Sequence, residues 1–334
     1  KCKFVFAIVF ILVVSNGFSQ IPNGYYDSCE GLFETELRLA LHNIIDNHNQ
    51  QVYSDLWELF EDTDQKPNGK VWDMYSDIPG GTPPYEYNFG FDQCGNYSGE
   101  GDCFNKEHSW PSSWSNDEYP MKSDLFHIYP TDGYVNGMRS NLPFGEVGSA
   151  NWTSLNGSKR GYSSYSGYSE IVFEPIDEYK GDFARTYFYM CTRYYNEDSG
   201  WIENDMVNGA ELKSWALEML FEWHFADPVS EKEIERNDAV YEIQNNRNPF
   251  IDHPEFAYWI WRGIFLGDVD IDEEITSYDA ALTLQYSAGI ISDWSDWQIV
   301  QADVNSDENI SSYDAALILQ YSAGIIDEFA NKKE

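Results

Sequence analysis

The sequence sets two groups with complementary chemistry side by side, the carboxylate of Glu107 and the imidazole of His108. A carboxylate oxygen is a good ligand for a divalent metal ion, and a histidine can accept a proton near neutral pH. Further along the chain, Asn136 offers an amide oxygen from a glycine-flanked turn, and Arg139 offers a bidentate donor for a phosphate group. A metal ion, a general base and a guanidinium group together suit hydrolysis of a phosphodiester bond.

The elements that hold these groups follow from the local sequence. Neighbouring residues of a strand point to opposite faces, so Glu107 and His108 can reach one substrate only at a bend or a strand end. The Ser-Trp-Pro at 109–111 predicts such an end, and the Gly-, Pro- and Asn-rich region 70–180 predicts loops and short strands. Apolar residues at helical spacing predict helices over residues 32–60, 182–195, 210–225 and 230–240. We therefore expect an α+β fold, mainly helical with short strands.

The wider context of this motif resembles the endonuclease I family of secreted and periplasmic nucleases, which have a ββα-metal (His-Me finger) active site. The first family element matches Glu107, His108 and Pro111. The second element matches Asp124, Leu125, His127, Val135, Asn136, Gly137, Arg139, Ser140 and Asn141. Further matches lie at residues 173–175, 180–182, 184–190, 236–238 and 243–250. The resemblance implies a ββα-metal nuclease domain over residues 20–262.

By this resemblance, Glu107 and Asn136 hold one Mg²⁺ or Mn²⁺ ion, and His108 deprotonates a water that attacks the phosphate. The products would carry 5′-phosphates. Because water attacks instead of a ribose 2′-hydroxyl, we expect cleavage of DNA and also of RNA, with no ranking between them.

Other polar residues of the motif allow two interpretations each. Three arginines could contact phosphate or could form structural ion pairs in so acidic a chain: Arg139, Arg185 and Arg247. His127 could orient the site or could be a hydrogen-bonded core histidine. The long basic insert of periplasmic family members is absent between the two motif elements, and any phosphate-clamping arginine from it is absent too.

An internal repeat marks the C-terminus, because residues 267–291 and 302–326 are identical at most aligned positions. Units this short cannot each bury a core, so we expect them to pack together as one small domain, residues 263–334. Oxygen-bearing residues recur at the spacing of a calcium-binding loop: Asp268, Asp270, Asp272, Glu274 (through its carbonyl) and Asp279, then Asp303, Asn305, Asp307, Asn309 (through its carbonyl) and Asp314. The alternative is an acidic, solvated repeat without metal.

The repeat resembles the type I dockerin, an all-α pair of EF-hand-like loops, over residues 266–328. It departs from that pattern at Glu273 and Glu308, which occupy a position that is usually glycine. The resemblance implies two Ca²⁺ ions and a cohesin-type protein partner. It assigns the partner contact to Ser277, Tyr278, Ser312 and Tyr313.

The charge of the chain restricts how it can meet a polyanion. The sequence has 57 acidic and 20 basic residues, with a formal net charge of −37. Such a charge argues against binding of nucleic acid or anionic lipid through the overall field, although a local site remains possible. Apolar residues make up 42% and aromatic residues 17%, which predicts a globular protein.

The N-terminus predicts export. Lys1 and Lys3 accompany an apolar run over residues 4–14, which indicates a signal peptide over residues 1–19, cleaved after Ser19 or Gln20. We expect a secreted, monomeric protein without membrane insertion, associated with the cell surface through its dockerin-like domain. In an oxidising compartment, the four later cysteines allow three pairings. Their spacing favours Cys94–Cys103, which leaves Cys29–Cys191.

Two hypotheses of different classes follow. The first is a secreted, metal-dependent, non-specific endonuclease tethered through its dockerin-like domain. The second is a non-catalytic nucleic-acid-binding or adhesion protein with a calcium-dependent attachment domain. Glu107, His108 and Asn136 together favour the enzyme, because a binding protein has no need of a general base. A metalloprotease of the His-Glu-x-x-His type is disfavoured because that motif is absent.

Overall fold

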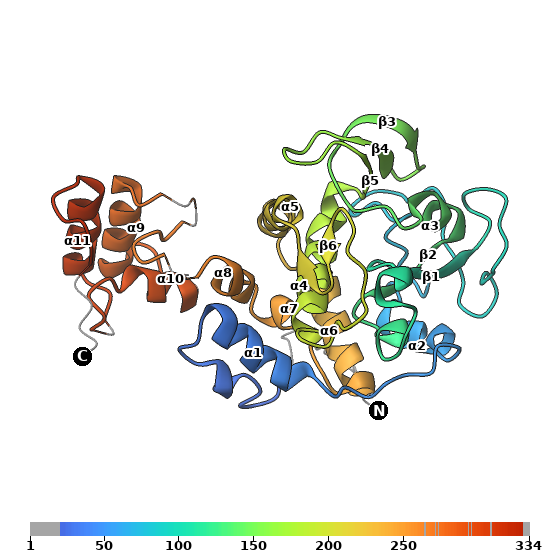
Figure 1. Ribbon diagram of the computed structural model, residues 1–334, viewed down its shortest axis with the longest axis horizontal. Helices are drawn as coiled ribbons and strands as arrows, with labels where there is room; N and C mark the ends of the chain where they lie inside the picture. The colour runs from blue at the N-terminus through green and yellow to red at the C-terminus, as the bar shows by residue number, and fades with distance from the viewer. Residues whose placement is uncertain are drawn as a thin grey trace, which may run out of the picture. The chain divides into compact units, whose positions relative to one another are not determined.

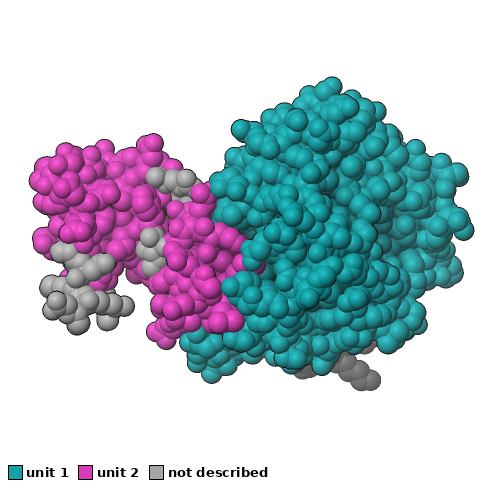
Figure 2. Space-filling view, in the orientation of Figure 1, with its two compact units in different colours: residues 1–28, 41–253 teal, residues 29–40, 254–334 magenta. Residues whose placement is uncertain are grey.

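The computed structural model of the chain describes residues 21–329, apart from Ile264, Ile271, Glu273, Asp293, Ser295 and Glu308. The expected signal peptide at residues 1–19 lies outside the described residues. So do Glu273 and Glu308, the two glutamates at the position of the repeat that is usually glycine. The chain divides into two compact units, one of residues 1–28 and 41–253 and the other of residues 29–40 and 254–334 (Figure 2). A domain boundary at residue 262 stays a prediction.

A buried helix forms the centre of the first unit. Every residue of α4 (Lys180–Arg193) is buried, and α5 (Ser214–Ala226) packs along it (Figure 1). The helix α7 (Pro249–Asp252) also contacts α4, while α6 (Glu231–Gln244) packs against α2 (Leu56–Thr63). A helix that is buried all round must be covered by other elements, so α4 is the scaffold on which the rest of the unit is built.

The strands lie in three small antiparallel sheets. In the first, β1 (Phe104–His108) pairs with β2 (Ile128–Asp132), and α3 (Gly133–Arg139) follows β2 without a loop. The other two sheets are formed by β3 (Val147–Thr153), β4 (Lys159–Ser163) and β5 (Ile171–Glu174), and by β6 (Val207–Asn208) and β7 (Glu211–Leu212). The predicted α+β class, helical with short strands over residues 70–180, is therefore confirmed.

The helices that the sequence predicts all form, with small shifts at their ends. Within 32–60 these are α1 (Glu34–Ile45) and α2, and the later ones are α4, α5 and α6. The helix expected from residue 210 begins only at Ser214, because Glu211 and Leu212 pair in β7. Ser230 caps α6 in a reciprocal capping box with Glu233. Short 3₁₀ turns occur at Asp27–Cys29, Ser112–Ser115, Met121–Ser123 and Asp177–Tyr179.

The second unit contains only helices among its described elements. They are α8 (Glu255–Trp261), α9 (Ser277–Ser287), α10 (Asp296–Ala302) and α11 (Ser312–Ser322), together with the first turns of α1. The equivalent repeat helices α9 and α11 pack on each other. Ala280, Val304 and Ile318 form a buried cluster between the repeats. The two short repeats thus share one core, as the sequence predicts.

Two further expectations concern export. Cys94 and Cys103 form a disulfide, which confirms the first predicted pairing. Cys29 and Cys191 are both buried, and their pairing stays a prediction. Within the described part of the chain, no helix combines the length and the apolar character needed to cross a membrane.

Candidate functional site

The motif residues lie on a strand–strand–helix element formed by β1, β2 and α3. The strand β1 ends at His108, as predicted, so Glu107 and His108 occupy the last two paired positions. Asn136 was expected in a turn, but it lies inside α3. This helix forms because the carboxylate of Asp132 caps it, accepting a hydrogen bond from the backbone N–H of Val135 at 2.8 Å.

Glu107 is a buried carboxylate with one oxygen occupied and one available. Its side chain is only 2% exposed, and Oε1 accepts a hydrogen bond from the Tyr75 hydroxyl at 2.9 Å and pairs with Arg139 Nη1 at 3.1 Å. Its Oε2 accepts no hydrogen bond from the described residues. Burial raises the pKa of Glu107 to about 7, against the opposing effects of Arg139 and Tyr75. A cation bound at Oε2 would supply the missing partner.

Asn136 is hydrogen-bonded to β1 through its side-chain amide. Its Nδ2 donates to Asn105 Oδ1 at 2.8 Å and to the carbonyl oxygen of Lys106 at 3.4 Å. Asn105 and Glu107 are two residues apart on β1 and share one face, so Asn136 approaches the face that carries Glu107. With its amide nitrogen engaged, Oδ1 remains as the acceptor. Two hard oxygens with room for water fit Mg²⁺, which keeps several waters when protein bound.

His108 has the protonation state that a general base needs. Its Nε2 lies 3.2 Å from the carbonyl oxygen of Lys122. A carbonyl only accepts, so Nε2 carries the proton and Nδ1 keeps its lone pair. The ring stacks on Tyr53, with centroids 5.7 Å apart. Burial, with a further effect of His127, lowers the pKa of His108 to about 3, so the ring is neutral and its Nδ1 lone pair can accept a hydrogen bond from water.

His127 lies behind His108 and has no exposed surface. Its Nε2 donates to the carbonyl oxygen of Met121 at 2.6 Å, and its ring centroid is 5.5 Å from that of His108. Asp124 is also buried and accepts hydrogen bonds from the hydroxyls of Tyr189 and Tyr194. The second motif segment therefore packs against His108 through the ring of His127.

Arg139 is enclosed beside the site and is only 1% exposed. Besides Glu107, its guanidinium group donates to the carbonyl oxygens of His108, at 2.8 Å, and of Ser109. Arg185 and Arg247 are enclosed too: Arg185 pairs with Glu233 and Arg247 pairs with Asp252, at 2.5 and 2.6 Å. The sequence allows these arginines either to contact phosphate or to form structural ion pairs, and in the structure all three form ion pairs.

Several side chains of the site give no signal in the sequence. Tyr75 reaches Glu107 and Tyr53 covers His108, and both tyrosines lie in turns outside the described helices and strands. Tyr187 donates to the carbonyl oxygen of Ser109 at 2.8 Å, and only the family resemblance over residues 184–190 points to it. These contacts join residues far apart in the chain, so local patterns carry no trace of them.

The first loop of the repeat gathers carboxylates at one point. The side-chain oxygens of Asp268, Asp270 and Asp279 lie within 4.8 Å of one another. Burial, together with the charges of Asp279 and Asp272, raises the pKa of Asp270. Three like charges this close repel each other unless a cation lies between them, so this donor set fits a calcium ion.

The second loop shows the same need for a cation in another way. Asn305 Oδ1 and Asp314 Oδ1 are buried without a hydrogen-bond partner among the described residues. Asp303 Oδ1 and Asp307 Oδ1 accept the backbone N–H groups of Asp307 and Asn309, each at 3.0 Å, which tightens the loop. Buried orphan oxygens cost free energy unless they are ligated, so the loop fits Ca²⁺ as well.

The residues assigned to a protein partner are on the surface. Ser277 and Tyr278 open α9, and Ser312 and Tyr313 open α11, and all four are exposed. Tyr278 is 59% and Tyr313 is 60% exposed, so the repeat presents the same aromatic ring twice.

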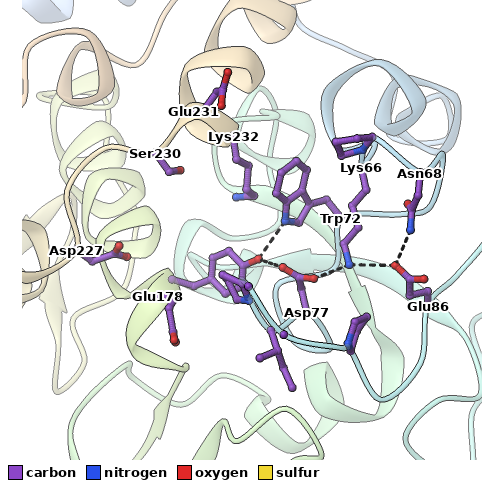
Figure 3. Close-up of a pocket in the computed structure, with 17 residues that line it drawn as sticks. Lys66, Asn68, Trp72, Asp77, Glu86, Glu178, Asp227, Ser230, Glu231 and Lys232 are labelled. Atoms are coloured by element: carbon purple, nitrogen blue, oxygen red, sulfur yellow. Dashed lines mark hydrogen bonds and ion pairs between the residues drawn. The ribbon is translucent and has the colours of Figure 1, made fainter. Parts of the chain in front are cut away.

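The first unit also contains a pocket of about 700 Å³ (Figure 3). Trp72, Tyr179 and several prolines line it, and none of the predicted catalytic residues does. Two of its carboxylates already pair with a lysine, since Lys66 contacts Asp77 at 2.5 Å and Glu86 at 3.3 Å. The pocket therefore adds nothing to the metal and base groups on β1 and α3.

Comparison with known proteins agrees with this arrangement. Residues 34–255 match the Endonuclease I family, and residues 266–321 match the dockerin type I domain. An extracellular ribonuclease of Bacillus amyloliquefaciens is 36% identical over 248 residues, which cover 71% of this chain and 78% of that protein. An extracellular ribonuclease of Bacillus subtilis (strain 168) is 35% identical over 247 residues, with the same coverage. An extracellular deoxyribonuclease of Aeromonas hydrophila is 27% identical over 136 residues, 40% of this chain and 50% of that protein. The chain therefore belongs to the endonuclease I family and carries a C-terminal type I dockerin domain.

Proposed function

We propose that the protein is a secreted, metal-dependent endonuclease that hydrolyses phosphodiester bonds of DNA and RNA without strong sequence preference. The observation that carries this proposal is the end of β1. There Glu107 carries a carboxylate, Asn136 is hydrogen-bonded to the strand face that Glu107 shares with Asn105, and the neutral His108 follows Glu107 in the chain. A metal ligand pair beside a general base is the minimal machinery for hydrolysis by an activated water.

In the proposed reaction each residue has a separate task. His108 Nδ1 accepts the proton of a water aligned with the scissile phosphate, while the Lys122 carbonyl fixes the ring through Nε2. Arg139 favours the ionised form of Glu107 and fixes its Oε1. Bound Mg²⁺ or Mn²⁺, held by Glu107 and Asn136, would stabilise negative charge on the phosphate and on the leaving 3′-oxygen. The products carry 5′-phosphates, and no 2′-hydroxyl is needed.

The relatives support both substrates. The two Bacillus proteins are named as ribonucleases and the Aeromonas protein as a deoxyribonuclease. The relatives' names also place them outside the cell, which agrees with the signal peptide expected at residues 1–19.

The C-terminal domain is proposed to bind two Ca²⁺ ions and a cohesin-type partner, so that a monomeric nuclease is held at the cell surface. Besides Tyr278 and Tyr313, apolar side chains at equivalent positions of the repeats stay exposed: Leu284 with Leu319, and Ile290 with Ile325. Exposed apolar side chains at repeated positions are typical of a docking face.

A cleavage assay tests the proposed activity. Incubated with supercoiled plasmid or single-stranded RNA, the protein is expected to degrade both in Mg²⁺ or Mn²⁺, because the oxygens of Glu107 and Asn136 need a divalent ion to act on phosphate. Excess chelator should stop cleavage, and added Mg²⁺ should restore it. A shift of the nucleic acid band without cleavage in Mg²⁺ would instead support the non-catalytic binding protein.

Calcium is expected to stabilise the second unit. It reduces the repulsion between the carboxylates of the first loop, and it ligates the buried oxygens of the second loop that have no hydrogen-bond partner. At a Ca²⁺ concentration about 100-fold above Kd, each site adds about 2.7 kcal/mol to the free energy of unfolding. Calorimetry of the full chain in Ca²⁺ and in excess EGTA measures this as a shift of one transition. Asp270→Asn should reduce the shift, whereas Asp327→Asn, outside the loops, should leave it unchanged. An equal transition temperature with and without Ca²⁺ would support the metal-free repeat.

A further inference from the structure

The basic side chains of the first unit are almost all neutralised by carboxylates. Among its described residues, only Lys70, Lys106 and Arg160 have no ion-pair partner. In a chain with a formal net charge of −37, this pattern leaves few cations for a polyanionic substrate. The position of each unpaired cation therefore decides where a phosphate backbone can be received.

Lys106 is the unpaired cation that adjoins the site. It precedes Glu107 on β1, and it is two residues from His108, so Lys106 and His108 share one strand face. Its Nζ lies 4.1 Å from the ring centroid of Tyr53, the same ring that stacks on His108. The Lys106 ammonium group and the His108 imidazole therefore both contact the ring of Tyr53.

Aromatic rings hold this ammonium group in place of carboxylates. Nζ lies 4.4 Å from the ring centroid of Trp57 in addition to Tyr53, and it donates one hydrogen bond to the carbonyl oxygen of Tyr53. A ring face attracts a cation but does not cancel its charge, so the two rings fix Lys106 in position without neutralising it. An ammonium has three N–H donors, and those not used by Tyr53 can bind an anion.

Lys122 gives an internal comparison. Its Nζ lies 5.7 Å from the same Tyr53 ring, but it also pairs with Asp117 at 2.5 Å. Lys122 is therefore neutralised, and its contribution to the site is the backbone carbonyl that orients His108. The two lysines lie around one ring, and only Lys106 keeps its charge available.

We propose that Lys106, held by Tyr53 and Trp57, is a phosphate-binding residue that receives the nucleic acid backbone beside the phosphate attacked at His108. The proposal rests on the proposed nuclease function and identifies its local source of positive charge. The enclosed arginines cannot serve here, because their guanidinium groups are turned to Glu107, Glu233 and Asp252.

The test compares Lys106→Gln with Lys70→Gln, which removes another half-buried lysine that has no ion-pair partner. Cleavage of a labelled single-stranded DNA oligonucleotide is followed in Mg²⁺ at several KCl concentrations. For Lys106→Gln, KM should rise about tenfold with kcat nearly unchanged. The slope of log(kcat/KM) against log[KCl] should change by about one, because one phosphate contact is lost. Lys106→Arg should restore both quantities, and Lys70→Gln should behave as the unchanged protein.

Two outcomes would overturn the inference: a Lys106→Gln variant with unaltered KM and salt slope, or the same change in Lys70→Gln. Lys106→Met retains the aliphatic stem against the rings, so it provides a folded charge-removal variant should the glutamine be destabilising. The failure of the unchanged protein to cleave would contradict the proposed function instead. Fluorescence anisotropy of the same oligonucleotide, bound with Ca²⁺ in place of Mg²⁺, then measures the Lys106 contact without any cleavage, and equal affinities would reject it.

Discussion

Replacing His108 by alanine should lower kcat for DNA and RNA cleavage by about 10²–10⁴-fold, the usual contribution of a positioned general base. The loss follows from Nδ1, the only ring nitrogen of His108 that still has a lone pair once Nε2 has donated to Lys122. KM should change little, because the metal ligands Glu107 and Asn136 stay in place. Plasmid cleavage rates under saturating Mg²⁺ measure the effect.

His108→Gln separates the base from its position. The glutamine amide extends far enough to donate to the Lys122 carbonyl in place of Nε2, but it has no basic nitrogen, so its activity should be as low as that of the alanine variant. His253→Ala, a half-buried histidine outside β1, β2 and α3, is the matched control and should retain activity. Cleavage by His108→Ala within tenfold of the unchanged protein would show that another group takes the proton.

Arg139→Met should destabilise the first unit by about 3–5 kcal/mol and should also abolish cleavage. The methionine fills part of the same space, but it leaves the Glu107 carboxylate buried without its cation. The variant also loses the hydrogen bonds to the carbonyl oxygens of His108 and Ser109, which hold the end of β1. Urea denaturation followed by tryptophan fluorescence measures the stability change.

The double variant Arg139→Met with Glu107→Gln isolates the charge. If the uncompensated carboxylate causes most of the loss, the double variant should be more stable than Arg139→Met alone. Arg139→Lys should be intermediate, because a lysine keeps the charge but cannot make the forked contacts. A stability of Arg139→Met within about 1 kcal/mol of the unchanged protein would contradict the positioning role, since isolated surface pairs are worth about that much.

The sequence predicts those parts of the site that depend on neighbouring residues. The end of β1 at His108 follows from Ser-Trp-Pro, and the start of α6 follows from the cap at Ser230. The helix around Asn136 is the exception, because Asp132 caps α3 where the glycines indicate a turn. The glycines weaken the helical pattern, whereas the cap acts through a contact that can be recognised only once β2 has been placed.

The sequence does not predict the parts that depend on distant contacts. Tyr75 encloses Glu107, and Tyr53 contacts both Lys106 and His108. Both tyrosines lie in turns, and their partners are distant in the chain. The composition predicts that the chain as a whole has few positive charges, but it does not predict which lysines and arginines remain without an ion-pair partner. The three motif arginines illustrate this, because their residue type suits both phosphate binding and the ion pairs that the structure displays.

The pairing of arginines inside the first unit also affects how the enzyme meets its substrate. A distant nucleic acid experiences mostly the acidic exterior, so the long-range force is repulsive and slows encounter, the reverse of electrostatic steering. Attraction begins only at contact range, at the metal and Lys106. Such a molecule does not stay bound along a polyanion by its general charge, so it should release a cleaved strand quickly instead of sliding along it.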